Sequence, residues 1–288
     1  MSAPSYAVIT PARDEVENLT RLATSLRGQA VAPARWVIVD NGSQDGTREL
    51  AGRLACETPW IQLVEAPAAA GLVRGGPVVR AFHVGVAALG DLPDFVAKVD
   101  ADVSCAPDFF ATLLDAFARD PSLGMASGAC HELQGEQWLP RYGTGDNVWG
   151  AARVYRRECL EAVLPLEERM GWDGIDVIKA NVNGWRTTAL LDLPFHHHRP
   201  EAIRDNAAGR AWAAQGRAAY YMGYRFSYLL ARTLYRLRSE RAAGAMLAGY
   251  VSGAWKRDAR VDPAVRAHIR RQQRWRHLPV RAREALGR

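Results

Sequence analysis

Phe95-Val96-Ala97-Lys98-Val99-Asp100-Ala101-Asp102 is a short apolar run that ends in two carboxylates one residue apart. The run has the composition of a buried β-strand, and ligands collect at the carboxyl ends of strands in open α/β sheets. Mg²⁺ and Mn²⁺ take oxygen ligands and share their shell with water and substrate phosphates, so one or two carboxylates suffice. An Asp-x-Asp pair by itself is more often a solvated turn or a helix cap, so the rest of the sequence has to decide.

Length and composition indicate a globular protein of the cytoplasm. The 288 residues, 48% of them hydrophobic, are enough for one large domain or a domain with an appendage. No apolar run approaches the roughly 20 residues of a membrane-spanning helix, and the N-terminus lacks a signal-peptide pattern. Cys56, Cys105, Cys130 and Cys159 are widely separated, which favours free thiols over disulfides or a zinc knuckle.

Charge is distributed unevenly along the chain. Residues 1–198 carry 17 Lys and Arg against 25 Asp and Glu, a net charge of −8, whereas residues 199–288 carry 20 against 6, a net charge of +14. An acidic body is unsuited to nucleic acid but can hold a cation that carries an anionic ligand, and a basic tail suits anionic surfaces. We therefore expect a catalytic domain over residues 1–200 and a basic helical extension over residues 201–288.

Strand and helix patterns alternate in the first 130 residues. Apolar strand patterns occupy residues 7–10, 36–39, 61–64, 95–99 and 124–129, and helical patterns occupy residues 16–26, 78–89 and 108–119. A further helix is expected after residues 40–43, with its N-cap at Ser43 or Asp45. This alternation predicts an α/β fold with a mostly parallel sheet flanked by helices.

Three ordered motifs carry a resemblance to a known family. They are Thr10-Pro11-Ala12-Arg13-Asp14-Glu15, Val39-Asp40-Asn41-Gly42-Ser43-Gln44-Asp45-Gly46-Thr47 and Val99-Asp100-Ala101-Asp102. Together they look like the signature of glycosyltransferase family 2 on a GT-A fold. The resemblance continues through residues 150–157, 171–176 and 184–185, and it covers roughly residues 5–200.

The resemblance implies an inverting transferase. A sugar moves from a nucleotide-diphosphate donor, most often UDP-linked, to an acceptor hydroxyl, with Mn²⁺ or Mg²⁺ as the cofactor. It also implies a donor half over about residues 1–104 and an acceptor half over about residues 105–200. The nucleotide-sugar contacts expected from the resemblance are Pro11, Arg13, Glu15, Asp40, Asn41, Arg80, Asp100, Ala101 and Asp102.

Some of these donor contacts have a second interpretation. Asp40 or Asn41 is suited to accept a hydrogen bond from uracil N3–H, but residues 40–43 also form a good turn on their own. The family pattern has Asn before Glu15, where this chain has Asp14. Arg80, like Arg74 before it, either meets diphosphate oxygens or lies on a solvated helix face.

In the family, the residue at Asp102 binds the metal and the one at Asp100 binds the ribose or the metal through water. The cation stabilises the charge on the departing nucleoside diphosphate. A histidine tract follows the apolar residues 188–195, and strand alternation places His196 and His198 on one face. The resemblance makes His198 the expected third ligand, with His197 behind it, and a structural histidine cluster is the alternative.

An acceptor hydroxyl needs a general base. The family places this base in an acidic motif that opens an acceptor-side helix ending at a glycine, and counting back from Gly184 reaches Asp173. Asp176 is the second candidate, and its alternative role is a first-turn acid favoured by the helix dipole. Trp172 and Trp149 are expected on the acceptor side, where Trp172 either stacks on a sugar or packs in the core.

The basic extension has the composition of membrane-surface helices. Residues 205–238 are predicted to be helical, with tyrosines and leucines between arginines, and residues 266–283 are more strongly basic. Alternatively, the apolar side covers the catalytic domain while the arginines face water, and residues 266–283 form a solvated helix or a disordered tail. We expect a glycan or lipid-linked acceptor, contact with the anionic inner face of a membrane, and no nucleic acid.

Two other functions fit parts of the sequence. A sugar nucleotidyltransferase shares such a sheet and a metal, but it needs a glycine-rich phosphate loop near the first strand, and residues 10–15 contain no glycine. A nucleic-acid-binding protein is compatible with the basic and aromatic residues of the extension.

Overall fold

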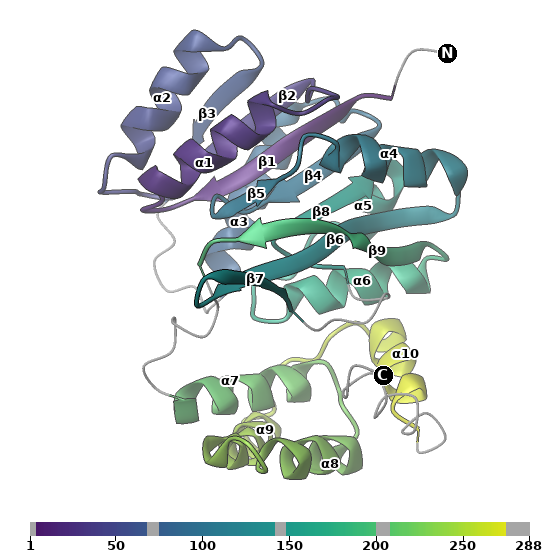
Figure 1. Ribbon diagram of the computed structural model, residues 1–288. Coiled ribbons are helices and arrows are strands. Elements are labelled where there is room, and N and C mark those ends of the chain that lie inside the picture. Colours follow the sequence, from purple (N-terminus) through teal and green to yellow (C-terminus); the bar gives the residue numbers. More distant parts are fainter. Residues whose placement is uncertain (1–3, 68–74, 142–147, 200–207, 275–288) are drawn as a thin grey trace. The chain divides into compact units, whose positions relative to one another are not determined.

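The computed structural model describes residues 4–67, 75–141, 148–199 and 208–274. The chain divides into two compact units, unit 1 over residues 1–200 and unit 2 over residues 201–288 (Figure 1). The division lies beside the point at which the charge of the sequence changes sign.

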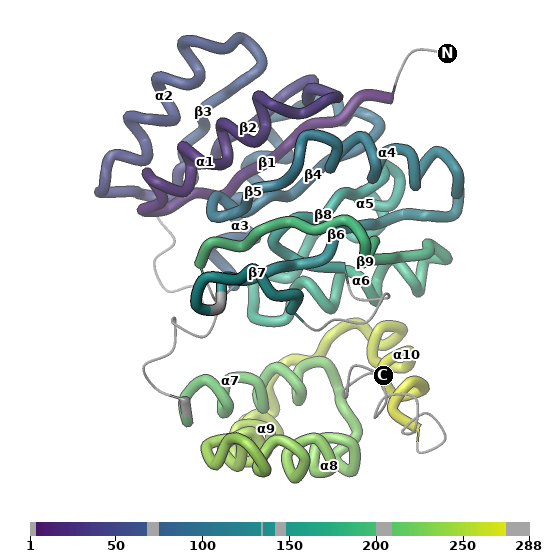
Figure 2. The backbone as a smooth tube through the Cα atoms, viewed as in Figure 1, coloured from purple at the N-terminus to yellow at the C-terminus, as the bar shows by residue number. Residues whose placement is uncertain are grey.

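Unit 1 is built on one β-sheet. Its strands, among the described residues, are β1 (Tyr6–Ala12), β2 (Arg35–Asp40), β3 (Ile61–Glu65), β4 (Phe95–Val99), β5 (Val103–Cys105), β6 (Leu123–Gln134), β7 (Gln137–Pro140), β8 (Ala152–Arg156) and β9 (Arg186–His197). They lie in the order β3-β2-β1-β4-β8-β6-β9-β5, with β7 paired to β6 (Figure 2). β3, β2, β1 and β4 are parallel, and antiparallel pairing begins where β8 joins β4. The three motifs therefore meet at the carboxyl ends of β1, β2 and β4.

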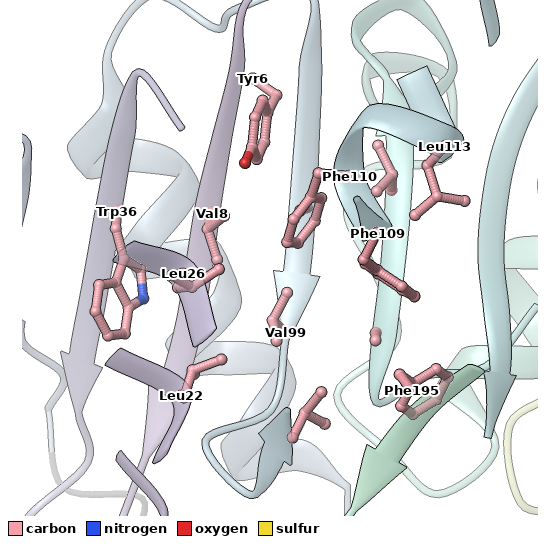
Figure 3. Packing of buried hydrophobic residues seen from close by; sticks show 14 of the residues in the cluster. Tyr6, Val8, Leu22, Leu26, Trp36, Val99, Phe109, Phe110, Leu113 and Phe195 are labelled. Atoms are coloured by element: carbon pink, nitrogen blue, oxygen red, sulfur yellow. The ribbon is translucent and has the colours of Figure 1, made fainter. Parts of the chain in front are cut away.

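Helices cover both faces of this sheet. One face holds α1 (Val16–Arg27), α2 (Thr47–Glu57) and α4 (Phe109–Arg119), and the other holds α3 (Gly76–Leu89), α5 (Arg157–Val163) and α6 (Trp172–Val182). The two-residue period of a strand divides the core in this way, because Val8 of β1 packs on the first face and Ile9 on the second. Figure 3 shows Trp36, Phe110 and Phe195 in the first core. The predicted α/β fold is confirmed.

The N-cap of α2 is neither of the two predicted residues, but lies one residue after Asp45 and three after Ser43. Gly46 caps the helix in a left-handed conformation, with φ of 95°. Ser43 instead accepts a hydrogen bond from the backbone N–H of Asp14 at 3.1 Å, and Asp45 accepts one from Val16 at 3.1 Å. β1 and β2 are adjacent and parallel, so the loops that follow them lie side by side. Ser43 and Asp45 can therefore hold the loop before α1.

Unit 2 is helical in its described part, with α7 (Ala208–Tyr221), α8 (Phe226–Arg236), the 3₁₀ turn η2 (Arg241–Gly244), α9 (Ala245–Trp255) and α10 (Pro263–Gln272). The continuous helix predicted through residues 205–238 is interrupted at Gly223, whose φ of 74° suits glycine. α7 and α9 pack so closely at Gly216 that a Cβ added there would lie 1.9 Å from the carbonyl oxygen of Met246. Of residues 266–283, those after 274 lie outside the described residues. No helix in the described ranges has the length and apolar character needed to span a membrane.

Candidate active site

The two carboxylates of the Asp-x-Asp motif lie in the turn between β4 and β5, with Ala101 buried between them. Asp102 is only 2% exposed, and its backbone carbonyl accepts a hydrogen bond from the N–H of His198 at 2.8 Å. Asp100 is partly buried and forms an ion pair with Lys98. Burial raises the pKa of Asp100, Lys98 opposes this rise, and the carboxylate of Asp102 adds to it. The turn thus concentrates negative charge in a poorly solvated place.

The structure brings His197, rather than His198, to this acidic pair. The Nε2 atom of His197 lies 3.4 Å from Oδ1 of Asp102, and its Nδ1 atom lies 3.5 Å from Oε1 of Glu132. Burial alone lowers the pKa of His197, but these carboxylates outweigh burial and raise it. His198 instead pairs through Nε2 with the Ser104 hydroxyl at 2.8 Å. Alternation along β9 separates His197 from His196 and His198, and the face that carries His197 is the one that meets Asp102.

The donor set fits a divalent cation. Asp100, Asp102 and His197 offer ligand atoms that all lie within 4.8 Å of one another. The two carboxylates follow β4 and the imidazole belongs to β9. This ligand set suits Mn²⁺ or Mg²⁺ and leaves coordination positions for water and phosphate oxygens. A bound cation would supply charge neutralisation at a diphosphate beside this turn.

The segment at residues 148–151 connects the acidic turn to α6. Nζ of Lys98 donates a hydrogen bond to the Gly150 carbonyl at 2.7 Å, and the N–H of Asp100 donates one to the Ala151 carbonyl at 2.8 Å. A Cβ placed on Gly150 would lie 3.2 Å from Cβ and 3.3 Å from Oδ2 of Asp173. The exposed carboxylate of Asp173 therefore stands next to the segment that holds Lys98 and Asp100.

A buried arginine fixes this arrangement. Arg153 of β8 has no exposed surface and donates to both carboxylate oxygens of Asp176, at 2.7 and 2.6 Å. It also donates to the backbone carbonyls of Val148 at 2.6 Å and of Asp173 at 3.2 Å. The Tyr155 hydroxyl donates to Asp176 at 2.6 Å. One guanidinium thus holds the 148–151 segment and the first turn of α6 at a fixed separation.

This network distinguishes the two candidate bases. Asp176 is 1% exposed, and Arg153 and Tyr155 occupy its oxygens. Burial raises the pKa of Tyr155 well above its ordinary value, and the carboxylate of Asp176 adds to the rise. Asp173, three residues earlier, is exposed and its side chain is available to a substrate. Of these two carboxylates, Asp173 is the one exposed as a general base has to be.

The two tryptophans expected on the acceptor side differ in their surroundings. The Trp172 ring is buried, with Nζ of Lys98 and Cζ of Arg153 each 5.1 Å from its centroid. Its position favours cation–π packing over stacking on a sugar. Trp149 is partly exposed, and Cζ of Arg141 lies 5.4 Å from its ring centroid.

The donor-side motifs have local partners. The side chain of Asp40 accepts hydrogen bonds from the backbone N–H groups of Gly42 at 3.2 Å and Ser43 at 3.3 Å, and Asn41 is buried next to it. Glu15 forms an ion pair with Arg199, which directly follows the histidine tract. The first motif is thereby tied to the end of β9 across unit 1.

The remaining donor-side residues are less closely tied to the acidic turn. Pro11 lies in β1, and Arg13 is exposed and 3.8 Å from Asp14. Arg80 of α3 pairs with Glu168 at 3.0 Å, so its guanidinium already has a carboxylate partner. Arg74 lies outside the described residues.

Three residues important to this geometry were not singled out from the sequence. Lys98 is a cation in an otherwise apolar strand, and Arg153 lies between the apolar residues Ala152 and Val154, which is a signal for a buried partner. Glu132 carries no such local signal, because its significance depends on the pairing of β6 with β9.

Comparisons with known proteins identify a family and a fold for this chain. The family described as Glycosyl transferase family 2 matches residues 7–164. One relative, the succinoglycan biosynthesis protein ExoA of Rhizobium meliloti (strain 1021), is 32% identical over 117 residues, which are 40% of this chain and 33% of that protein. The match thus spans about a third of the relative's length.

Solved structures share the fold. The mannosyltransferase PcManGT from Pyrobaculum calidifontis, solved with GDP-Man and Mn²⁺, has a TM-score of 0.58 at 16% identity, over 99% of this chain and 85% of that chain. S. aureus TarS, solved with UDP-GlcNAc, has a TM-score of 0.57 at 18% identity, over 77% of this chain and 67% of that chain. At these identities the likeness shows the fold alone, and it confirms the expected GT-A fold.

Replacing Asp176 by Asn is expected to destabilise the protein far more than replacing Asp173 by Asn. Asp176→Asn leaves the buried guanidinium of Arg153 without its counter-charge, which typically costs about 3–5 kcal/mol. Asp173→Asn alters an exposed side chain and should change the free energy of unfolding by about 0.5 kcal/mol or less. Urea unfolding followed by circular dichroism measures both values, and equal small changes would contradict the role assigned to Arg153.

Proposed function

We propose, because the chain belongs to glycosyl transferase family 2, that it transfers a sugar from a nucleotide-diphosphate donor to an acceptor hydroxyl with inversion at the sugar carbon. A UDP-sugar is the favoured donor, and the acceptor is a glycan or a lipid-linked glycan in polysaccharide assembly. The resemblance to part of ExoA supports the last point. Family membership favours this activity over the nucleotidyltransferase and the nucleic-acid-binding protein considered from the sequence.

A single observation carries the proposal. The 148–151 segment joins the acidic turn, through Lys98 and Asp100, to the exposed carboxylate of Asp173. A donor diphosphate belongs at the acidic turn, where Asp102, Asp100 and His197 are suited to hold Mn²⁺ or Mg²⁺. A base belongs on the other side of the sugar, which is where an acceptor enters an inverting site.

In the proposed reaction, Asp173 takes the proton of the acceptor hydroxyl as that oxygen attacks the anomeric carbon. The new bond from oxygen to carbon forms on the face opposite the diphosphate, and the bond from the anomeric carbon to the diphosphate oxygen breaks. The electron pair leaves with the nucleoside diphosphate. A carboxylate that is exposed and yet held at a fixed place by its own backbone carbonyl is suited to this task.

Asp176 is assigned a positioning role in this proposal. It neutralises Arg153, and Arg153 in turn holds the backbone of Asp173. Asp40 and Asn41 remain the proposed contacts for the base of the nucleotide, together with Pro11, Arg13 and Glu15 at the neighbouring strand end. Arg80 is the weakest of the proposed donor contacts, because Glu168 pairs with it.

Unit 2 has a surface suited to an anionic bilayer. Along α8, Phe226, Leu230 and Leu234 recur every four residues and are 50%, 38% and 58% exposed. On α9, Trp255 is 86% exposed. The described residues 208–274 carry 14 Lys and Arg against 3 Asp and Glu, a net charge of +11. Apolar stripes flanked by arginines bind membrane interfaces, so we propose that the enzyme works at the inner face of a membrane.

Binding of UDP is expected to require both a divalent cation and Asp102. A diphosphate beside two carboxylates is repelled by several kcal/mol at low local dielectric unless a cation lies between them. Calorimetry of UDP with Mn²⁺ and with EDTA measures this, and Asp102→Asn should weaken binding roughly 10²-fold. Asp108→Asn, an exposed acid six residues later, is the matched control. Equal affinity for UDP with Mn²⁺ and with EDTA would contradict a metal at the donor site.

Asp173→Asn is expected to lower the transfer rate by roughly 10²-fold or more while leaving the affinity for UDP within a few fold, because only the basicity of the side chain is lost. Transfer of radiolabelled sugar and UDP calorimetry separate the two effects. Asp192→Asn, an exposed acid on β9, serves as the control. A nearly normal transfer rate in Asp173→Asn would assign the base elsewhere.

The protein is expected to co-sediment with phosphatidylglycerol vesicles at low salt and to be released at high salt. Each arginine near an anionic leaflet contributes about 1 kcal/mol, so replacing Arg236, Arg238 and Arg241 by Gln should weaken binding roughly 10²-fold. Replacing the exposed Arg48, Arg53 and Arg119 of unit 1 by Gln is the matched control. Equal losses in both sets, or no sedimentation at low salt, would refute the membrane assignment.

A further inference from the structure

His197 faces two different groups of potential metal ligands. Its Nε2 atom points to Asp102, while its Nδ1 atom lies 3.5 Å from Glu132. On that second side, Cys130, Glu132 and His197 offer ligand atoms that again lie within 4.8 Å of one another. The pairing of β6 with β9 explains this, because Glu132 is opposite His197 and Cys130 is on the same face of β6 two residues earlier.

The second group differs from the first in its chemistry. It combines a thiol sulfur, an imidazole nitrogen and a carboxylate oxygen, and Cys130 is only 2% exposed. Thiolate ligands select Zn²⁺ and other borderline or soft ions, whereas the carboxylates of Asp100 and Asp102 suit Mn²⁺ and Mg²⁺. Three protein ligands with a fourth position left for water is a common arrangement for zinc.

We propose that Cys130, Glu132 and His197 form a second metal site, selective for Zn²⁺, which competes with the site at Asp100 and Asp102. A neutral imidazole has only one nitrogen lone pair for a metal, since its other nitrogen carries the proton. His197 therefore serves one cation at a time, and Zn²⁺ on Nδ1 removes the nitrogen ligand from the donor-binding metal. The competition, but not the existence of the zinc site, rests on the proposed function.

Arg141 opposes metal binding at the second site. Its Nη1 atom lies 3.2 Å from Oε1 of Glu132, and a divalent cation there is repelled by the charge of the guanidinium. Zn²⁺ has to displace Arg141 or use the other oxygen of Glu132. Removing the charge should therefore tighten zinc binding, an effect opposite to that of removing a ligand.

Co²⁺ is the probe for the site, because a thiolate bound to Co²⁺ gives an intense near-ultraviolet charge-transfer band. The intact protein should show this band on titration with Co²⁺, and Zn²⁺ should abolish it. Cys130→Ser should lose the band, Glu132→Gln should weaken Co²⁺ binding by roughly tenfold or more, and Arg141→Gln should strengthen it. Cys56→Ser, which alters an exposed cysteine, is the matched control and should keep the band.

Two results would overturn the proposal: no thiolate band in the intact protein, or an unchanged band in Cys130→Ser. Circular dichroism of each variant shows whether it is folded. If Cys130→Ser does not fold, Arg141→Gln still tests the site, because it removes no ligand and should strengthen Co²⁺ binding. Asp102→Asn should keep the cobalt band even though it loses Mn²⁺-dependent UDP binding. Failure of the zinc site is thereby distinguished from failure of the proposed function.

The competition is measured separately by electron paramagnetic resonance of bound Mn²⁺. Zn²⁺ should release Mn²⁺ from the intact protein at concentrations that leave Mn²⁺ bound in Cys130→Ser. Equal release from both proteins would mean that Zn²⁺ displaces Mn²⁺ directly at the aspartates, and this result would contradict the shared use of His197.

Discussion

Arg153 is a guanidinium with no exposed surface, and its donors reach one carboxylate and the backbone carbonyls of three residues on two segments. A charge can remain in such a place only if it is paired and its donors are satisfied. The ion pair with Asp176 meets the first condition, and the carbonyls meet the second. Buried ion pairs add little net stability, so the consequence of this one lies in geometry: it fixes the start of α6 against the segment before β8.

Lys98 repeats this design on the next strand. It is buried, it forms an ion pair with Asp100, and it donates to the Gly150 carbonyl. The Trp172 ring lies within 5.1 Å of both cations. Two desolvated cations on neighbouring strands therefore hold one short segment between the acidic turn and Asp173. In this arrangement the proposed donor and acceptor chemistry shares a rigid support, as proximity catalysis requires.

Histidine placement shows how strongly a site depends on strand pairing. Alternation along β9 separates His197 from its two neighbours, but alternation alone does not say which face meets the aspartates. The pairing of β9 with β6 on one side and with β5 on the other decides it. The same pairing places Cys130 and Glu132 beside His197, although 65 residues separate Glu132 from it in the chain.

The sequence by itself determined the α/β fold, the three motifs at the strand ends and the acidic turn, because periodicity and turn residues act within a few positions. It also indicated Asp173 through the resemblance to the family. Only the tertiary structure decided that Asp176 is buried, that Trp172 packs between cations and that His197 faces the turn. It also decided that Gly223 divides the helix expected through residues 205–238. The physical reason is that burial and ion pairing depend on which strands and helices become neighbours, and residues distant in the chain fix those contacts.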